Sequence, residues 1–197
     1  HQGAFDVAFL GSVPNMTVYA PASFRELDSM LSIAVREKSG PVALRYPRGG
    51  EGDYTDDHSR EDATVLCTGD DITVVTYGIS VNAALAAADE LAKEGVRAEV
   101  IKLNRLLPLS PELVRESLRK TGRFIMAEEA CRPGGMGTLL LADAAANGVL
   151  LRGAQLLDLG SGVIKHGSVS ELQHRLHLDA EGITAAAKEI MHEKDPA

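Results

Sequence analysis

The feature that most restricts the fold of this sequence is the alternation of short apolar runs with longer stretches of helical period. Residues 16–20 form a short apolar run that a proline stops. Ser23 and Glu26 then have the spacing of a capping box, and apolar residues follow at helical spacing to about Lys38. A second apolar run covers residues 42–46. Strand, helix and strand in this order predict a parallel α/β unit.

The same alternation continues to the end of the chain. Two short β-type runs, 63–67 and 72–78, flank the turn-like "TGDD" and predict a hairpin. The other expected elements are helices over 80–93, from Ser110 and Pro111, from "GGMG" to about 147, from the capping box "SVSE" (168–171) and over 180–192, with strands over 97–103, 123–129 and 154–160. We therefore expect an α/β protein with a mainly parallel sheet covered by helices.

An acidic segment interrupts this alternation. Of the fourteen residues 49–62, four are Asp, two are Glu and three are Gly. This composition leaves almost nothing to bury and predicts a solvated linker at a domain boundary. We expect the end of one α/β domain over 1–52, an acidic linker over 53–62 and a second α/β domain over 63–197. The strand–helix–strand piece within residues 1–48 is expected to be detached from the second domain.

Charge and composition argue against several classes of partner. The 197 residues include 20 Lys and Arg against 28 Asp and Glu, a net charge of −8. Nucleic acid and anionic membranes are therefore not expected as partners. No apolar run approaches the ~20 residues that cross a bilayer, and no signal peptide is expected. Cys67 and Cys131 lack CxxC spacing, so we expect two reduced thiols in a cytoplasmic protein.

The expected strand over 42–46 runs into "RYPRGG", residues 45–50. The proline fixes the backbone before Arg48, and the two glycines leave room after it. A guanidinium on so stiff a strand end can grip a phosphate through paired N–H donors. The alternative is that Arg48 forms a structural ion pair.

A glycine-rich stretch, "CRPGGMG", follows another expected strand. Gly134, Gly135 and Gly137 could open a phosphate-binding helix, but the GxGxxG spacing and the P-loop lysine are missing, which favours a tight turn and close packing. Glu128 and Glu129 stand at the carboxyl end of the strand, where α/β active sites collect. A charged edge or a subunit contact is the structural alternative for these two acids.

The histidines do not form a metal-binding pattern. His174 and His177 are three apart on an expected helix without an obvious third ligand, so a solvated helix face is expected. His166 is expected in a loop, with no assigned role. His1, in "HQGAFD", places a titratable imidazole near a glycine that lets a ligand approach the backbone. A disordered chain end is the alternative for His1.

Three stretches together carry a resemblance to a known family. "HQGAFDVAFLGSVPNMTVYAPAS", "GPVALRYPRG" and "AEEACRPGGMG" resemble the C-terminal third of the 1-deoxy-D-xylulose-5-phosphate synthases, a thiamine-diphosphate-dependent branch of the transketolase family. The resemblance extends to about residue 180 and includes "IKHGSVSELQHRLHLDAEGI". It implies a transketolase C-terminal-like domain preceded by the end of a pyrimidine-binding domain.

The resemblance also implies an activity and two site residues. The family condenses pyruvate, with loss of CO2, with glyceraldehyde 3-phosphate, for isoprenoid, thiamine and pyridoxal synthesis. His1 matches the family's active-site histidine, which acts at the centre where cofactor and substrate meet. Arg48 matches the arginine that binds the phosphate of the aldehyde. Arg45 takes no role from the resemblance and is expected to form an ion pair.

The resemblance places other parts of the machinery outside this sequence. The family's thiamine diphosphate and Mg²⁺ ligands, and its cofactor-activating glutamate, have no match here. No bound cofactor and no metal is therefore expected on this chain alone, which is expected to be inactive as a fragment or as one subunit of a split enzyme. The whole enzyme is expected to be a homodimer through the C-terminal domain.

Two alternatives remain open at this point. The chain could be part of another thiamine enzyme with the same C-terminal domain, such as a transketolase or the β subunit of a 2-oxoacid dehydrogenase. It could also be a non-catalytic dimerisation module.

Overall fold

The computed structural model describes residues 3–192, whose strands form two sheets. The larger sheet has the order β3-β5-β4-β7-β8 and the smaller one the order β2-β1-β6. The strands are β1 (Thr17–Tyr19), β2 (Val42–Leu44), β3 (Ala63–Cys67), β4 (Ile72–Tyr77), β5 (Ala98–Leu103), β6 (Arg105–Leu107), β7 (Arg123–Ala127) and β8 (Gly153–Leu157). The helices are α1 (Asp6–Leu10), α2 (Phe24–Glu37), α3 (Val81–Lys93), α4 (Glu112–Thr121), α5 (Met136–Ala146), α6 (Val169–Arg175) and α7 (Ala180–His192).

The larger sheet is mainly parallel, as expected. β5, β4, β7 and β8 run parallel, and β3 is antiparallel to β5. The predicted hairpin between residues 63–67 and 72–78 is wrong, because β3 pairs with β5 while β4 lies between β5 and β7. All six residues of β4 are buried. Such a strand needs neighbours on both edges and cover on both faces, which a hairpin at a sheet edge does not provide.

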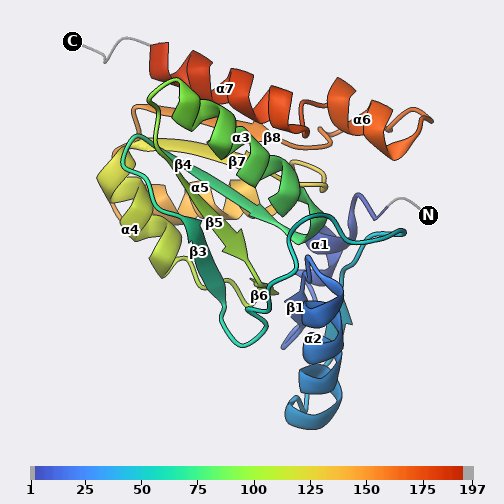
Figure 1. The fold of residues 1–197 in the computed structure, drawn as a ribbon. Coiled ribbons are helices and arrows are strands. Elements are labelled where there is room, and N and C mark those ends of the chain that lie inside the picture. Colours follow the sequence, from blue (N-terminus) through green and yellow to red (C-terminus); the bar gives the residue numbers. More distant parts are fainter. Residues whose placement is uncertain (1–2, 193–197) are drawn as a thin grey trace.

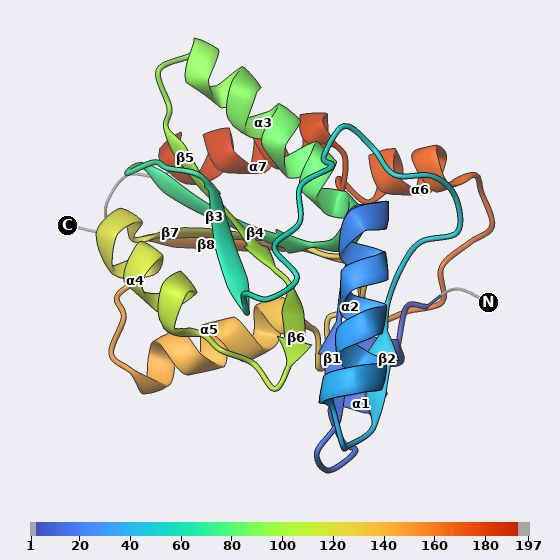
Figure 2. The ribbon, with the colours of Figure 1, turned by 60° about the horizontal axis from the view of Figure 1, so that its bottom comes forward.

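Helices cover both faces of the larger sheet. Figure 2 shows α3 and α7 on one side and α4 and α5 on the other. The α3–α7 side buries a core that includes Val74, Leu91, Val100, Ile125 and Ile183. The opposite side buries a core that includes Ile101, Leu118, Phe124, Met126 and Leu140. Within the part of the chain described, no helix combines the length and apolarity needed to cross a bilayer.

The N-terminal residues pack against the C-terminal ones and are not a detached piece. β1 pairs in parallel with β2 but antiparallel with β6, which belongs to the C-terminal part of the chain. Val7 and Val18 share a buried core with Tyr77 and Leu106. Figure 1 shows α1, β1 and α2 gathered at one end of the larger sheet. The expectation of a separate piece is wrong because β6, a three-residue strand, gave no recognisable pattern in the sequence.

The two predicted capping boxes, at α2 and α6, are observed with one variation. The Ser168 side chain and the Glu171 side chain form a complete capping box at α6. At α2 the Ser23 hydroxyl accepts the Glu26 N–H, as expected. The Glu26 carboxylate, however, accepts the Ala22 N–H at 2.8 Å and points into the protein. The Ser23 hydrogen bond of the predicted capping box is therefore present, whereas the Glu26 carboxylate accepts the N–H of Ala22 and not that of Ser23.

The acidic segment that follows β2 has no helix or strand between residues 50 and 62. Most of it is exposed, but Tyr54 is only 6% exposed. The expectation that this segment buries almost nothing is wrong at Tyr54, whose hydroxyl donates to the buried Glu26 carboxylate at 3.0 Å. At the end of the segment, Asp62 accepts a hydrogen bond from the Ser110 hydroxyl, which therefore does not cap α4.

Candidate functional site

The loop after β2 contains the exposed Arg48. Among residues 3–192 no hydrogen bond or ion pair holds its side chain. Gly49 has a φ of +138°, a conformation that favours glycine, and an added Cβ at Gly49 or Gly50 would meet nothing within 4 Å. The donors of the exposed Arg48 are therefore available to a ligand, and the described residues supply no structural ion pair for it.

Three cavities meet at Arg48. The first, of about 270 Å³, lies against the start of α2 and includes Phe24 and Glu51 in its lining. A small cavity of about 170 Å³ is lined by Gly3, Asp6, Arg45, Arg48, Tyr77 and Glu129, among others. A large cavity of about 500 Å³ extends from the same loop towards α6, where its wall is apolar and includes Leu172 and Leu176. Arg48 and the N-terminal residues thus share two cavities.

Arg45, three residues before Arg48, contacts the protein through Nε, Nη2 and the face of its guanidinium. Its Nε donates to both carboxylate oxygens of Asp6 at 3.1 Å. Its Nη2 donates to the carbonyl of Gly3 at 3.0 Å and to the carbonyl of Glu129. The guanidinium also lies 5.5 Å from the centre of the Tyr77 ring. The expected ion pair of Arg45 is present, within a larger set of contacts.

Glu128 lies behind this cluster and is 1% exposed. Its carboxylate accepts the Met136 N–H at 3.0 Å, the Gly137 N–H at 2.9 Å and the Tyr77 hydroxyl at 3.0 Å. Burial raises the pKa of Glu128, against the opposing effect of these three donors. Glu128 thus caps the start of α5, which leaves that helix end occupied.

The glycines of "GGMG" serve packing, as the sequence favoured. A Cβ on Gly135 would lie 2.6 Å from the Glu128 Oε1, and one on Gly137 would lie 2.7 Å from Leu156. Gly134 has a φ of +78°. These positions let the start of α5 close onto the Glu128 carboxylate, so the stretch is not a phosphate loop.

Glu129 differs from its neighbour because its side chain faces the large cavity. Its carboxylate accepts a hydrogen bond from the Gln173 amide at 2.9 Å, which ties α6 to the end of β7. Glu128 and Glu129 therefore do not act as a pair. His166 is exposed in the segment before α6, and no role follows from its position.

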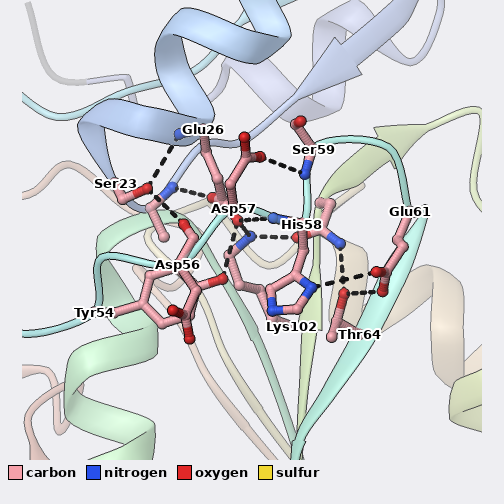
Figure 3. Close-up of polar contacts among 12 residues, drawn as sticks. Ser23, Glu26, Tyr54, Asp56, Asp57, His58, Ser59, Glu61, Thr64 and Lys102 are labelled. Atoms are coloured by element: carbon pink, nitrogen blue, oxygen red, sulfur yellow. Dashed lines mark hydrogen bonds and ion pairs between the residues drawn. The ribbon is translucent and has the colours of Figure 1, made fainter.

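A second polar cluster joins α2 to the larger sheet (Figure 3). Glu26 and Lys102 are both fully buried, and the Lys102 Nζ lies 2.7 Å from the Glu26 Oε1. The same carboxylate accepts the Tyr54 hydroxyl at 3.0 Å and the His58 N–H at 3.2 Å. Burial lowers the pKa of Lys102, although Glu26 acts in the opposite direction. The Lys102 ammonium also donates to Asn104.

The sequence indicates this cluster only weakly. The one signal was a lysine in the apolar run "AEVIKL", since a buried strand rarely carries an unpaired charge. Its partner lies 76 positions away in the sequence. No local pattern connects the two residues.

His174 and His177 are both exposed, as expected, but His177 lies beyond the end of α6 with a φ of +59°. His174 lies 2.7 Å from Asp179, which the sequence did not suggest. Among residues 3–192, His174, Asp179 and Glu181 are the one group of three potential metal ligands close together. The other predicted site residue, His1, lies outside the described residues.

The sequence matches two family descriptions in succession. Residues 1–51 match "Transketolase, pyrimidine binding domain" and residues 61–183 match "Transketolase, C-terminal domain". The unmatched residues between them fall in the acidic segment.

Curated relatives match nearly the whole chain. The 1-deoxy-D-xylulose-5-phosphate synthase 1 of Geobacter sulfurreducens is 39% identical over 202 residues, which cover 98% of this chain and 31% of the relative. The 1-deoxy-D-xylulose-5-phosphate synthase of Anaeromyxobacter sp. is 38% identical over 208 residues, with 98% and 32% covered. The chain thus spans about a third of the length of these relatives.

A solved structure described as "Split gene transketolase, inactive beta4 tetramer" has a similar fold. It superposes with a TM-score of 0.77 at 29% sequence identity, covering 94% of this chain and 61% of the other. The similarity therefore extends over both sheets.

Proposed function

The chain belongs to the transketolase family, and from this premise we propose that it is part of a 1-deoxy-D-xylulose-5-phosphate synthase. The reaction joins pyruvate and glyceraldehyde 3-phosphate to form 1-deoxy-D-xylulose 5-phosphate, with one molecule of CO2 released. The names of the curated relatives support this assignment over the other thiamine enzymes.

The observation that carries the proposal is the state of Arg48. It is the cation of the "RYPRGG" loop without a partner among residues 3–192, and it lines three cavities. A bidentate guanidinium suits the phosphate of the aldehyde, and its neighbouring glycines allow a close approach. We assign Arg48 to phosphate binding.

We assign His1 to proton transfer at the reacting centre. The supporting observation is that Gly3, two positions later, lines both the small and the large cavity together with Arg48. The segment that follows His1 and the phosphate-binding arginine therefore border the same space.

The described residues do not fit a thiamine diphosphate and magnesium site. The glycine-bordered start of α5, where a diphosphate could bind, is filled by the Glu128 carboxylate. The three potential metal ligands lie in α6 (His174), in the turn after it (Asp179) and in α7 (Glu181), and none of them lines a cavity beside Arg48. We propose that the cofactor-binding residues belong to the remaining two thirds of the relatives' length.

The N-terminal part of the structure supports the need for further polypeptide. α2 exposes Phe24, Leu31 and Val35 at 57%, 51% and 75%, along one side of the helix. β2 is the last strand of its sheet among the described residues. An open strand edge beside an apolar helix face is suited to additional chain.

A second candidate is a transketolase subunit, because the split-gene transketolase structure resembles both sheets of this chain. Under that function the enzyme would transfer a two-carbon ketol unit between sugar phosphates. Arg48 would keep its role, since both reactions use phosphorylated aldehydes. An assay with pyruvate against one with a ketose phosphate as donor separates the two functions.

Arg48→Ala in the complete enzyme tests the assignment. Loss of a charge-assisted contact costs about 1.5–3 kcal/mol, so the KM for glyceraldehyde 3-phosphate should rise about ten- to a hundredfold. The KM for pyruvate should change little, because pyruvate has no phosphate. Arg48→Lys should restore part of the affinity.

Arg119→Ala is the matched control, since Arg119 is exposed on α4 away from the cavities. It should leave both KM values unchanged. If Arg48→Ala weakens both substrates equally and lowers the melting temperature, Arg48 has a structural role and the phosphate assignment is wrong.

A further inference from the structure

Arg45 contacts residues 3–6, the first residues that the structure describes. Its guanidinium contacts three separate parts of the structure: the carbonyl of Gly3 and the carboxylate of Asp6, the carbonyl of Glu129 after β7, and the ring of Tyr77 at the end of β4. Its side chain is 17% exposed. No other residue in the loop after β2 makes contacts to all three parts.

We propose that Arg45 is a positioning residue that holds residues 3–6 against the end of β7. It thereby fixes, at the wall of the small cavity, the start of the segment that leads back to His1. This inference rests on the proposed function, in which His1 and Arg48 act on one substrate.

The backbone contacts show how this segment is held. The carbonyl of Gly3 accepts from Arg45, and the carbonyl of Ala4 accepts the Cys131 N–H at 2.7 Å. The Asp6 carboxylate accepts from Arg45 and from the Val7 N–H at 2.8 Å, at the start of α1. Hydrogen bonds thus hold the carbonyls of Gly3 and Ala4 and the side chain of Asp6 in one position.

We call these contacts of the Arg45 guanidinium, to Gly3, Asp6, Glu129 and the Tyr77 ring, the Arg45 clamp. The clamp requires an arginine at position 45. The planar guanidinium donates from Nε to one acceptor group and from Nη2 to two others, while its face lies over an aromatic ring. A lysine could pair with Asp6 but could not reach all three acceptors in one geometry. Burial alone would lower the pKa of Arg45, but the nearby Tyr77 and Asp6 raise it overall, so the cation is retained.

Arg45 and Arg48 have different roles, although both belong to the loop after β2. Arg45 donates to three protein groups, whereas Arg48 has no such partner among the described residues. Both line the small cavity. A misplacement of about 1 Å in a catalytic group can cost about a hundredfold in rate. Loss of the clamp should therefore act on turnover, and loss of Arg48 on phosphate affinity.

The first arm of the test measures amide hydrogen exchange in the 197-residue chain. Arg45→Gln should speed exchange at least about tenfold in peptides that cover residues 3–10 and Cys131, because the donor that holds Gly3 and Asp6 is lost. Arg48→Gln and Arg119→Gln are the matched controls and should leave these peptides unchanged. Circular dichroism verifies that each variant is folded. Should Arg45→Gln not fold, Asp6→Asn removes the charge of the clamp, and it should speed exchange in the same peptides to a smaller extent.

The second arm measures kinetics in the complete enzyme. Arg45→Gln should lower kcat about ten- to a hundredfold with the KM for glyceraldehyde 3-phosphate within about twofold. Arg45→Lys should give intermediate values of both exchange and kcat. This split between kcat and KM is the opposite of that expected for Arg48→Ala.

Three results would overturn the inference. They are unchanged exchange in Arg45→Gln, faster exchange with unchanged kcat, or a raised KM for the phosphorylated substrate in place of a lowered kcat. Failure of the proposed function looks different, because the unmodified complete enzyme would then lack synthase activity. In that case the exchange arm still decides whether Arg45 holds residues 3–6.

Discussion

Two polar clusters join the N-terminal residues to the larger sheet, one around Glu26 and Lys102 and one around Arg45. In the first, both charged side chains have no exposed surface. In the second, the Arg45 side chain remains 17% exposed and lines two cavities. The first cluster is completely buried, and the second forms part of the walls of these two cavities.

The two clusters also differ in the parts of the chain that supply their hydrogen-bond partners. Glu26 accepts from Lys102, Tyr54 and the His58 N–H, which belong to β5 and to the acidic segment. Arg45 donates mainly to carbonyl and carboxylate groups of residues 3–6 and Glu129. One cluster fixes how large parts of the chain pack, and the other fixes a short segment beside a cavity. In this protein, the cluster that borders a space for a ligand is therefore the one with the stronger claim to a functional role.

The largest effect on this comparison is expected from Lys102→Met. The substitution leaves the Glu26 carboxylate buried without its cation, which should cost about 3–5 kcal/mol of unfolding free energy. Urea denaturation followed by circular dichroism measures the loss. The double variant Lys102→Met/Glu26→Gln removes both charges and should recover at least about half of it.

Lys93→Met is the matched control for this prediction. Lys93 pairs with Glu90 at 2.7 Å on the exposed side of α3. The control should leave the denaturation midpoint nearly unchanged, because an exposed pair contributes little. If Lys102→Met loses less than about 1 kcal/mol, the two clusters do not differ in kind and the comparison fails.

The sequence predicted the parts of this fold that depend on local pattern. The helical stripe and cap predicted α2, and the final helix over 180–192 is confirmed as α7. The hairpin of 63–67 with 72–78 was wrong, since strand partners are chosen by burial on both faces and not by the turn between two runs. β6 was missed because three residues carry no measurable period.

The site divides along the same line. Arg48 could be singled out because its neighbours in sequence, a proline and two glycines, define its surroundings. The ion pair of Arg45 was predicted, but its partners could not be, since Asp6 and Glu129 are distant from it in sequence. The Glu26–Lys102 pair spans 76 positions and needs the packed structure to bring it together.

The second effect concerns Glu128, behind the Arg45 cluster. Glu128→Gln places an amide where a carboxylate accepts two helix N–H groups, and should cost about 1–3 kcal/mol. Burial raises the pKa of Glu128 in the folded state, so between the unfolded and the folded pKa the folded protein holds a proton that the unfolded chain has released. From this site, stability should therefore fall as the pH rises from about 4.3, the unfolded value, through the raised folded pKa.

The predicted fall of stability with pH is checked by measuring the unfolding free energies of the original protein and of Glu128→Gln. The measurements are made in pH steps from about 4 to 8. The difference between the two free energies should be largest at the acid end and shrink as the pH rises. A difference that grows with pH would mean that the helix N–H donors outweigh burial. The Arg45 cluster would then rest on an ionised Glu128 carboxylate.

The smallest effect is expected at His174, which provides an exposed pair to set against the two buried clusters. The hydrogen bond and charge of Asp179 raise the pKa of His174. The stability that this pair contributes should be fully present below about pH 6.5, the unfolded value, and should be lost as the pH rises through the raised folded pKa. His174→Gln should therefore melt slightly below the original protein at pH 5.5 and together with it at pH 8.5.

His166→Gln is the control for His174, since His166 is exposed and precedes α6. Asp179→Asn is unsuitable, because the Asp179 carboxylate also accepts the Gly182 N–H at 2.8 Å and supports the start of α7 at every pH above its own titration. Scanning calorimetry at the two pH values resolves a shift of a degree or less. A shift at pH 5.5 as large as that of Glu128→Gln would show that exposure does not weaken a charged pair in this protein. The contrast between sealed and open clusters would then not explain their energetics.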